Sequence, residues 1–390
     1  MKIGIINEQK NPQDHRLVFS PSSLFQLKQL YTRLDIKVEH SDTRFFDDKA
    51  YQDLGIEVAN DISDCDVFFG VNEVPLESLI ENKTYFFFSN CSKEPSHNSP
   101  FLQALLKKNI NYFDCKTLVE THQKYIDFDK YAGIIATYYA IRAFGIKFEL
   151  FKLPKASALS GKEALLTQLK RQVLPPLKFV VTGTGSVESG VREILEALKI
   201  KRVSTADFLN KKYTQSVYTQ LDVSDYNKRK DAKAFDTTDF FQHPDEYSSD
   251  FQRFTKVADV YIAAHFYTFD APEILTRQML QEHNCKIKIV ASISDDLHNA
   301  IACLLRYSTI DNPFYGYLPS ENKEIDLFHP AAVVVAALNK SCFELPKDAS
   351  QDLGILLIES IIPAFINGDT DGILLGAKIT ENGKLGPRFS

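Results

Sequence analysis

The sequence predicts an α/β protein whose sheets are parallel and doubly wound, with helices on both faces. Short apolar runs alternate along the chain with segments of helical periodicity, which is typical of this class. One apolar run, 177–181, ends at the glycine pair of Gly183-Thr184-Gly185 and is followed by a helical segment. The length of 390 residues suggests two domains or three, and an apolar fraction of 44% is ample for their cores.

The first part of the chain contains a complete strand–helix alternation. Ser20 and Pro21 begin the first expected helix, because serine is a good N-cap and proline fits the first helical position. Expected strands cover 2–6, 36–38, 65–71, 85–88 and 110–113, and expected helices cover 21–30, 47–54 and 101–107.

A long helical pattern from Tyr131 leads into a second series of elements. The segment 214–249 is polar and aromatic, and we expect it to consist largely of loops. Helices are expected over 165–173, 187–198, 272–282 and around 353–361, strands over 177–181, 200–204, 259–264 and 287–291, a loop over 309–317 and an apolar run over 331–338.

The glycine turn is a candidate phosphate-binding loop. Glycines let the backbone approach a phosphate, and the first amides of the following helix are unpaired donors. The spacing is G-x-G-x-x-x-x-G, so Gly190 comes two residues later than the third glycine of the usual dinucleotide fingerprint. An ordinary βα turn is the alternative. The candidate cofactor-binding residues of this turn are Gly183, Thr184, Gly185, Ser186 and Val187.

Composition favours a small-molecule partner. A net charge of −6 and a pI of about 5.9 do not favour nucleic acid or an anionic membrane. Six scattered cysteines without a C-x-x-C pair argue against a disulfide framework or a zinc site and indicate a reducing, cytoplasmic location. We find no apolar run of the roughly 18–20 residues that a membrane span needs.

Several stretches, taken in order, resemble the alanine dehydrogenase/transhydrogenase superfamily, and most closely its branch of lysine-forming saccharopine dehydrogenase and lysine–ketoglutarate reductase. Phe179–Gly190 resembles the glycine loop of that reductase. The other similar stretches are 1–21, 83–89, 131–133, 275–277, 308–314 and 345–350.

This resemblance implies two Rossmann-like domains with the active site in a cleft between them. The outer domain would combine residues 1–130 with a return segment, 326–390, and residues 131–325 would bind NAD(P). The implied reaction is NAD(P)-dependent oxidoreduction at the C–N bond of an amino acid or secondary amine. The implied substrate is a small amino acid or oxo acid, and the oligomeric state is left open.

The resemblance also implies site residues, and several of them are changed. Arg16 matches a substrate-binding arginine, which could clamp a carboxylate, although unaided it reads as a surface ion-pair residue. Asn72 and Asn90 stand where the family has a lysine and a histidine, and an amide has no titratable proton near neutral pH. Lys124 lies where the branch often has an arginine. Two further positions, Ser292 and Asn339, lack the branch's aspartates.

The cofactor is expected to be NAD or NADP. An acid at the tip of the second strand of such a domain grips the ribose of NAD, and a nearby cation suits NADP. The stretch Lys201-Arg202-Val203-Ser204 has cations and no acid at its tip, which slightly favours NADP, while Asp207 keeps NAD open. Ser204 and Ala264, at the ends of two expected strands, are further candidate cofactor contacts, and His265 is either a structural residue or a proton shuttle.

Two functions therefore stay open. The first is an active oxidoreductase of the saccharopine or alanine dehydrogenase type. The second is a catalytically altered or inactive NAD(P)-binding homologue that serves as a sensor or partner protein, for which the asparagines at 72 and 90 are the argument.

Overall fold

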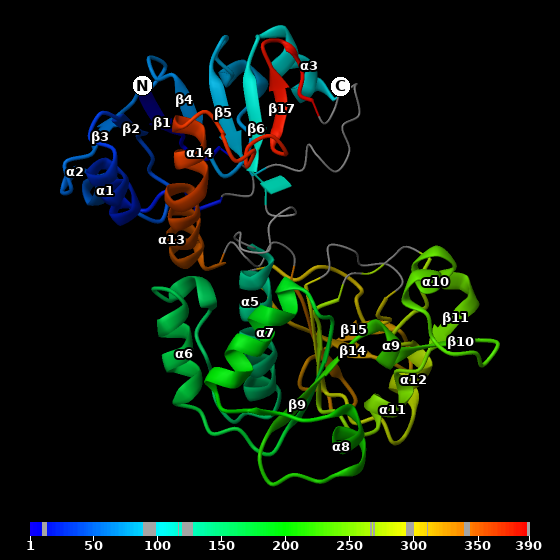
Figure 1. The fold of residues 1–390 in the computed structure, drawn as a ribbon. Coiled ribbons are helices and arrows are strands. Elements are labelled where there is room, and N and C mark those ends of the chain that lie inside the picture. Colours follow the sequence, from blue (N-terminus) through cyan, green and yellow to red (C-terminus); the bar gives the residue numbers. More distant parts are fainter. Residues whose placement is uncertain are drawn as a thin grey trace. The chain divides into compact units, whose positions relative to one another are not determined.

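The protein folds into two compact units. The structure, a computed structural model, describes residues 1–9, 14–88, 99–115, 117–118, 128–265, 267, 270–293, 300–309, 311–338 and 344–387. Unit 1 combines Met1–Asp127 with Pro346–Ser390, and unit 2 is Phe128–Leu345 (Figure 1). The second division follows Leu345, not residue 325 as expected, because β16 (Val333–Ala337) pairs in parallel with β13 (Ile289–Ser292) inside the sheet of unit 2.

Unit 1 is built on an eight-stranded sheet in the order β18-β17-β6-β5-β4-β1-β2-β3. The six strands from β6 to β3 are parallel, whereas β17 and β18 are antiparallel. The strands are β1 (Lys2–Ile5), β2 (Asp35–Glu39), β3 (Glu57–Ala59), β4 (Val67–Phe69), β5 (Thr84–Phe87), β6 (Asn111–Asp114), β17 (Lys378–Glu381) and β18 (Lys384–Leu385). The helices are α1 (Pro21–Leu30), α2 (Asp48–Gln52), α3 (Pro100–Lys107), α13 (Pro346–Leu356) and α14 (Ile362–Ile366).

An aromatic ladder forms part of the core of unit 1. Phe69, Phe86 and Phe113 lie opposite one another on β4, β5 and β6, and their rings stack at centroid distances of 4.7 and 4.5 Å. Phe365 of α14 meets the Phe86 ring edge-on at 5.2 Å, so the C-terminal helix covers this ladder. Alternate aromatic residues of these strands thus form one packed layer on this face of the sheet.

Unit 2 contains a second eight-stranded sheet, ordered β15-β14-β16-β13-β12-β7-β9-β8. The six strands from β16 to β8 are parallel, and β14 and β15 are antiparallel. The further strands are β7 (Lys178–Thr182), β8 (Lys201–Arg202), β9 (Val217–Leu221), β12 (Val260–Ala263), β14 (Tyr315–Leu318), β15 (Lys323–Ile325), and the separate pair β10 (Asn227–Arg229) and β11 (Tyr247–Ser249). The helices are α5 (Phe128–Lys147), α6 (Lys162–Lys170), α7 (Ser186–Ala197), α8 (Thr205–Asn210), α9 (Val223–Tyr226), α10 (Thr237–Gln242), α11 (Gln252–Thr255) and α12 (Arg277–Gln281).

The predicted fold class is confirmed, with two differences. Each sheet is mixed, because antiparallel strands extend it at one end beyond six parallel strands. The segment 214–249, expected to be mostly loop, contains β9, which lies between β8 and the glycine strand β7. Because β9, and not β8, lies beside β7, different residues become candidates for cofactor binding.

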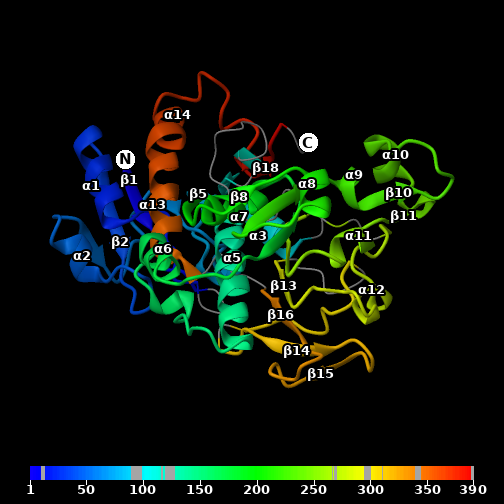
Figure 2. The same ribbon diagram turned by 90° about the horizontal axis from the view of Figure 1, so that it is seen from below.

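Helices α5 and α7 lie side by side (Figures 1 and 2), and their backbones come into direct contact at two glycines. A Cβ placed on Gly133 would lie 1.8 Å from the carbonyl oxygen of Val187, and one on Gly190 would lie 1.9 Å from that of Lys130. Gly190 therefore serves the contact between the two helices, and no other residue fits at either position.

One helical stretch, Pro346–Ile366, is long and apolar enough to cross a membrane by length and composition. Such a stretch was not expected from the sequence. More than half of its most apolar window, 56%, is buried inside the fold, and buried core helices pass the same test, so the observation is weak evidence for a membrane span.

Candidate functional site

The carboxyl ends of the parallel strands of unit 2 form one row. Leu221, Thr182, Ala263, Ser292 and Ala337 are register partners across β9, β7, β12, β13 and β16. From β7 the chain goes first to β8 and β9 on one side and then to β12 on the other, so the strand order reverses at β7. Ligands of open α/β sheets bind at such a reversal, outside the carboxyl ends of the strands.

The glycine turn lies at this reversal. Gly183 follows β7 with φ of +115°, and a Cβ there would lie 2.2 Å from the carbonyl oxygen of Ala264. The Gly183 amide donates to the Leu221 carbonyl at 3.0 Å, and its carbonyl accepts from Gln220 Nε2 at 3.1 Å. The turn is thus fixed to the strands on both sides, which requires glycine at position 183.

The other residues of the turn leave room for a ligand. Thr184 and Gly185 are exposed, and a Cβ on Gly185 would meet no other atom within 4 Å. Gly185 is the N-cap of α7 and supplies no side-chain cap, and Ser186 and Val187 are the first two residues of the helix. The amides of a helix's first turn have no partner within the helix, so this end of α7 fits a phosphate group.

The strand beside the glycine strand ends in an acid. Asp222 follows β9, is exposed, and caps the short helix α9, where its Oδ1 accepts from the Val223 amide at 2.6 Å. The sequence analysis assigned this place to 200–204, but β8 is the edge strand and is separated from β7 by β9. Ser204 instead caps α8, with its Oγ accepting from the Asp207 amide at 3.1 Å. The expected preference for NADP therefore rested on a strand that is not the neighbour of β7.

Ala264 and His265 follow β12, at the same carboxyl edge of the sheet as the glycine turn. The Ala264 amide donates to the Thr182 carbonyl at 2.9 Å. Nδ1 of His265 is 2.6 Å from Oγ1 of Thr182, and burial lowers the pKa of His265 to about 4. The imidazole is therefore neutral at pH 7, which suits a structural residue better than a cationic proton donor.

Unit 1 holds a second polar cluster. Arg16 is buried and paired with Asp14, with 2.6 Å between Nη2 and Oδ2 and 2.9 Å between Nε and Oδ1. Asn72 Nδ2 donates to both Asp14 Oδ2 and Glu8 Oε2, at 3.0 Å each, and Glu8 also accepts the amides of Val71 and Asn72. Arg16 and Asn72 thus belong to one network, and the carboxylates of Glu8 and Asp14 complete it.

The two carboxylates of this cluster differ. Burial opposes ionisation of Asp14, but the charge and hydrogen bonds of Arg16 together with the hydrogen bond from Asn72 outweigh it and hold the Asp14 pKa below its usual value. Burial raises the pKa of Glu8 to about 7, against the hydrogen bonds from Asn72 and Val71. Of the other sequence-predicted positions, Asn90, Lys124 and Asn339 lie outside the described residues, and Ser292 is the last residue of β13.

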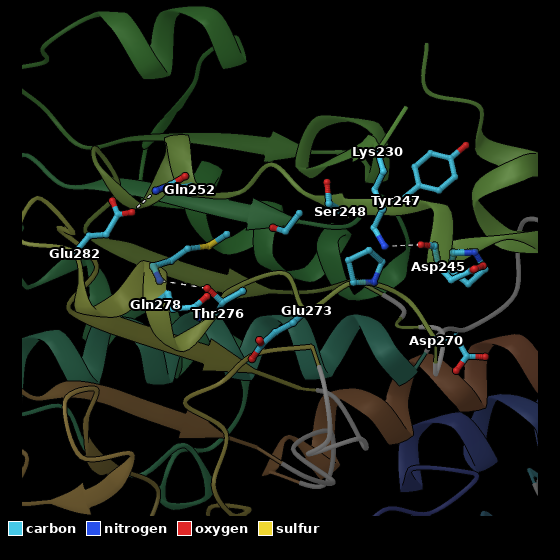
Figure 3. Close-up of a pocket in the computed structure, with 14 residues that line it drawn as sticks. Lys230, Asp245, Tyr247, Ser248, Gln252, Asp270, Glu273, Thr276, Gln278 and Glu282 are labelled. Carbon is cyan, nitrogen blue, oxygen red and sulfur yellow. Dashed lines mark hydrogen bonds between the residues drawn. The ribbon is translucent and has the colours of Figure 1, made fainter. Parts of the chain in front are cut away.

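A separate pocket of about 490 Å³ lies in unit 2 between the β10–β11 pair and α12 (Figure 3). Its lining includes one lysine, Lys230, and several carboxylates, among them Glu273 and Glu282. Lys230 Nζ donates to the Asp245 carbonyl at 2.7 Å. None of the residues that line this pocket belongs to the glycine turn. In the described part of the chain, no group of three or more His, Cys, Asp and Glu side chains could hold a metal ion.

Comparison with known proteins identifies relatives of the whole chain. Residues 4–135 match the family model described as alanine dehydrogenase/PNT, N-terminal domain. An alpha-aminoadipic semialdehyde synthase of Arabidopsis thaliana is 27% identical over 398 residues, covering 91% of this chain and 37% of the relative. The NAD(+)-dependent, L-lysine-forming saccharopine dehydrogenase of Yarrowia lipolytica is 19% identical over 382 residues, covering 92% of this chain and 90% of the relative. The chain spans less than half the length of the synthases it matches.

Solved structures share the fold. An L-alanine dehydrogenase superposes with a TM-score of 0.64 and 15% identity, covering 100% of this chain and 98% of the other. A transhydrogenase from Sinorhizobium meliloti superposes with a TM-score of 0.56 and 15% identity over the full length of both chains. The family model that matches residues 4–135 confirms the expected resemblance to the alanine dehydrogenase/transhydrogenase superfamily.

Sequence reasoning missed Asp14, Glu8 and Asp222. Asp222 could have been found, because Asp222-x-x-Asp225 is a helix-start pattern that follows the strand-like run Val217–Leu221. Glu8 and Asp14 meet Asn72 only through the fold, so no local pattern marks them.

Proposed function

We propose that this chain, a homologue of alpha-aminoadipic semialdehyde synthase with an alanine dehydrogenase/PNT N-terminal domain, is a nicotinamide-dependent oxidoreductase acting on the C–N bond of an amino acid or secondary amine. The observation that carries the proposal is the glycine turn at the strand-order reversal of unit 2. Gly183 there has a conformation that only glycine adopts easily, and Gly185 leaves open space before α7. Such a turn fits the pyrophosphate of a dinucleotide.

The cofactor in this proposal is NAD(H). A bound nicotinamide would supply the hydride acceptor or donor. The amides of Ser186 and Val187 would hold the pyrophosphate, and Asp222 at the tip of β9 would accept hydrogen bonds from the ribose hydroxyls. An anion at this position favours a ribose 2′-hydroxyl over a 2′-phosphate, because like charges repel.

The substrate side of the proposal rests on unit 1. Arg16 is the candidate partner of a substrate carboxylate, and Asp14 already holds part of its hydrogen-bonding capacity. A small amino acid or 2-oxo acid suits a guanidinium that is held in place in this way. A cytoplasmic location belongs to the same proposal, and the described cysteines, Cys65, Cys115, Cys285 and Cys303, are all unpaired.

The experiment is a turnover assay with the purified chain. NADH and NADPH are offered with 2-oxo acids together with lysine, ornithine or alanine, and with ammonia, and nicotinamide absorbance is followed. Turnover of about 1–10³ per second with NADH supports the proposal. Absence of nucleotide binding in a thermal-shift screen would contradict it, because a ligand that binds the folded state raises the melting temperature.

A second candidate function is a nucleotide-binding homologue without catalysis. The observation that favours it is Asn72. Its side-chain amide donates to two carboxylates and cannot act as a general acid or base near neutral pH. The double variant Asn72→Lys with Asn90→His separates the two functions. Activity that appears only in this variant supports the non-catalytic function, whereas activity in the wild type rejects it.

A further inference from the structure

Helix α7, which follows the glycine turn, carries an acidic residue where the dinucleotide fingerprint has its third glycine. In G-x-G-x-x-G the third glycine follows the second by three positions. Counting from Gly183 and Gly185, that position is Glu188, and the next glycine, Gly190, serves the contact with α5. Glu188 is the third residue of α7, so it lies in the turn whose free amides face the open space at Gly185.

Glu188 is buried without a full set of partners. It is 3% exposed, and within the described part of the chain its Oε1 accepts no hydrogen bond. This carboxylate forms an ion pair with Arg192, at 3.7 Å between Nε and Oε1, and the Arg192 side chain is 44% exposed. A buried carboxylate normally accepts hydrogen bonds, so this one is poorly compensated.

The groups around Glu188 come from the elements packed on α7. Arg202 on β8 and Arg192 favour its ionisation, and Glu196 on α7, whose Oε1 accepts from Tyr218 of β9 at 3.3 Å, opposes it. Lys130 of α5 and Lys162 of α6 are both paired with Glu193, at 2.7 and 2.6 Å. Burial is the largest influence and raises the pKa of Glu188.

An anion in this turn competes with a phosphate. The N-terminus of a helix carries about half a positive charge, which stabilises one nearby anion within the first turn. When Glu188 is ionised, the positive end of the helix already stabilises its carboxylate, and the negative charge of that carboxylate repels the pyrophosphate. When Glu188 is neutral, both effects disappear.

We propose that Glu188 sets the nucleotide affinity of this site: its negative charge in the first turn of α7 opposes the dinucleotide pyrophosphate, so nucleotide binds more weakly when Glu188 is ionised than when it is neutral. The inference rests on the proposed nucleotide site and goes beyond it. It assigns a determinant of affinity to a residue that touches no reacting atom. It also makes binding dependent on pH.

The test compares Glu188→Gln with Glu196→Gln. The second variant removes the same charge from the same helix, in its last turn. The Kd of NADH is measured between pH 5 and pH 8 by the fluorescence of NADH itself, because the chain contains no tryptophan. Glu188 lies in the same helical turn as the amides that would hold the pyrophosphate. Two charges that close at a partly buried site interact strongly enough that Glu188→Gln is expected to bind NADH roughly tenfold more tightly at pH 8. This advantage shrinks toward one as the pH falls, and Glu196→Gln matches the wild type at pH 8, where Glu188 is ionised in both proteins.

The result that overturns the inference is an equal or weaker affinity of Glu188→Gln at every pH, with a melting temperature like that of the wild type. If Glu188→Gln does not fold, Glu188→Ala and the pH dependence of the wild-type Kd carry the test, and a wild-type Kd independent of pH also overturns it. If no variant binds NADH or NADPH at any pH, the proposed function itself fails, and the inference falls with it.

Discussion

Replacing Asp222 with asparagine is expected to weaken NADH binding and to reduce the discrimination against NADPH. Asp222 follows the strand directly beside the glycine strand, where an acid accepts hydrogen bonds from the ribose hydroxyls. Hydrogen bonds to charged groups contribute about 1.5–3 kcal/mol. Because Asp222 is exposed, we take the lower end of this range, which corresponds to roughly tenfold in Kd.

Asparagine is the suitable replacement because it preserves the local structure. Asp222 also caps α9, and asparagine is as good an N-cap as aspartate, so the fold should be little affected. The control is Ser204→Ala, at the strand that the sequence analysis had chosen. Loss of the α8 cap should lower stability by about 1 kcal/mol without changing either nucleotide Kd.

The assay measures the Kd of NADH and NADPH for the three proteins, with melting temperatures as a check on folding. The reasoning is refuted if Asp222→Asn leaves both Kd values within about twofold of the wild type, a change comparable to that of an unimportant surface substitution. It is refuted equally if Ser204→Ala, and not Asp222→Asn, changes the nucleotide preference.

Three further predictions test the rest of the site. Gly183→Ala should abolish nucleotide binding and destabilise unit 2 by about 1–3 kcal/mol or more in urea denaturation, because its Cβ would lie 2.2 Å from a carbonyl oxygen; stability equal to the wild type would contradict this. Asp14→Ala should destabilise unit 1 by about 3–5 kcal/mol, because it leaves the buried Arg16 without its counter-charge, and Asp14→Ala with Arg16→Met should recover much of the loss; a single variant as stable as the double one would argue against the ion pair. The stability of the wild type relative to His265→Gln should fall as the pH decreases from about 6.5 to about 4, because the unfolded chain protonates His265 while the folded chain does not; melting curves of the two proteins measure this difference, in which the opposite contribution of Glu8 cancels.

Local sequence patterns predicted most of the elements. Ser20 caps α1 as expected, with its Oγ accepting from the Ser23 amide at 3.1 Å, and the apolar aromatic runs became β4 and β5. The glycine turn was also predicted in place, because Gly183-Thr184-Gly185 directly follows an apolar run and precedes a helical pattern. These features depend on local backbone preferences, which a single sequence reveals.

Spatial order could not be predicted in the same way. β9 was missed because Val217–Leu221 is short and lies in a polar, aromatic segment, and its place between β8 and β7 is determined by packing and not by chain order. The antiparallel strands β14 and β17 have no pattern that separates them from parallel ones. The expected preference for NADP was wrongly founded for this reason, because it was inferred from the residues at the end of β8 and not from those at the end of β9.

The charge balance of the unit 1 cluster bears on whether Asn72 implies lost catalysis. The resemblance implies a lysine at position 72, so the cluster here has one guanidinium, Arg16, facing two carboxylates. Arg16 lowers the pKa of Asp14, and burial raises that of Glu8 to about 7, so the second carboxylate takes up a proton near neutral pH. Glu8 is 3.0 Å from the Asn72 amide. The cluster therefore retains a group that titrates near neutral pH, and the asparagine alone is not evidence that proton transfer has been lost.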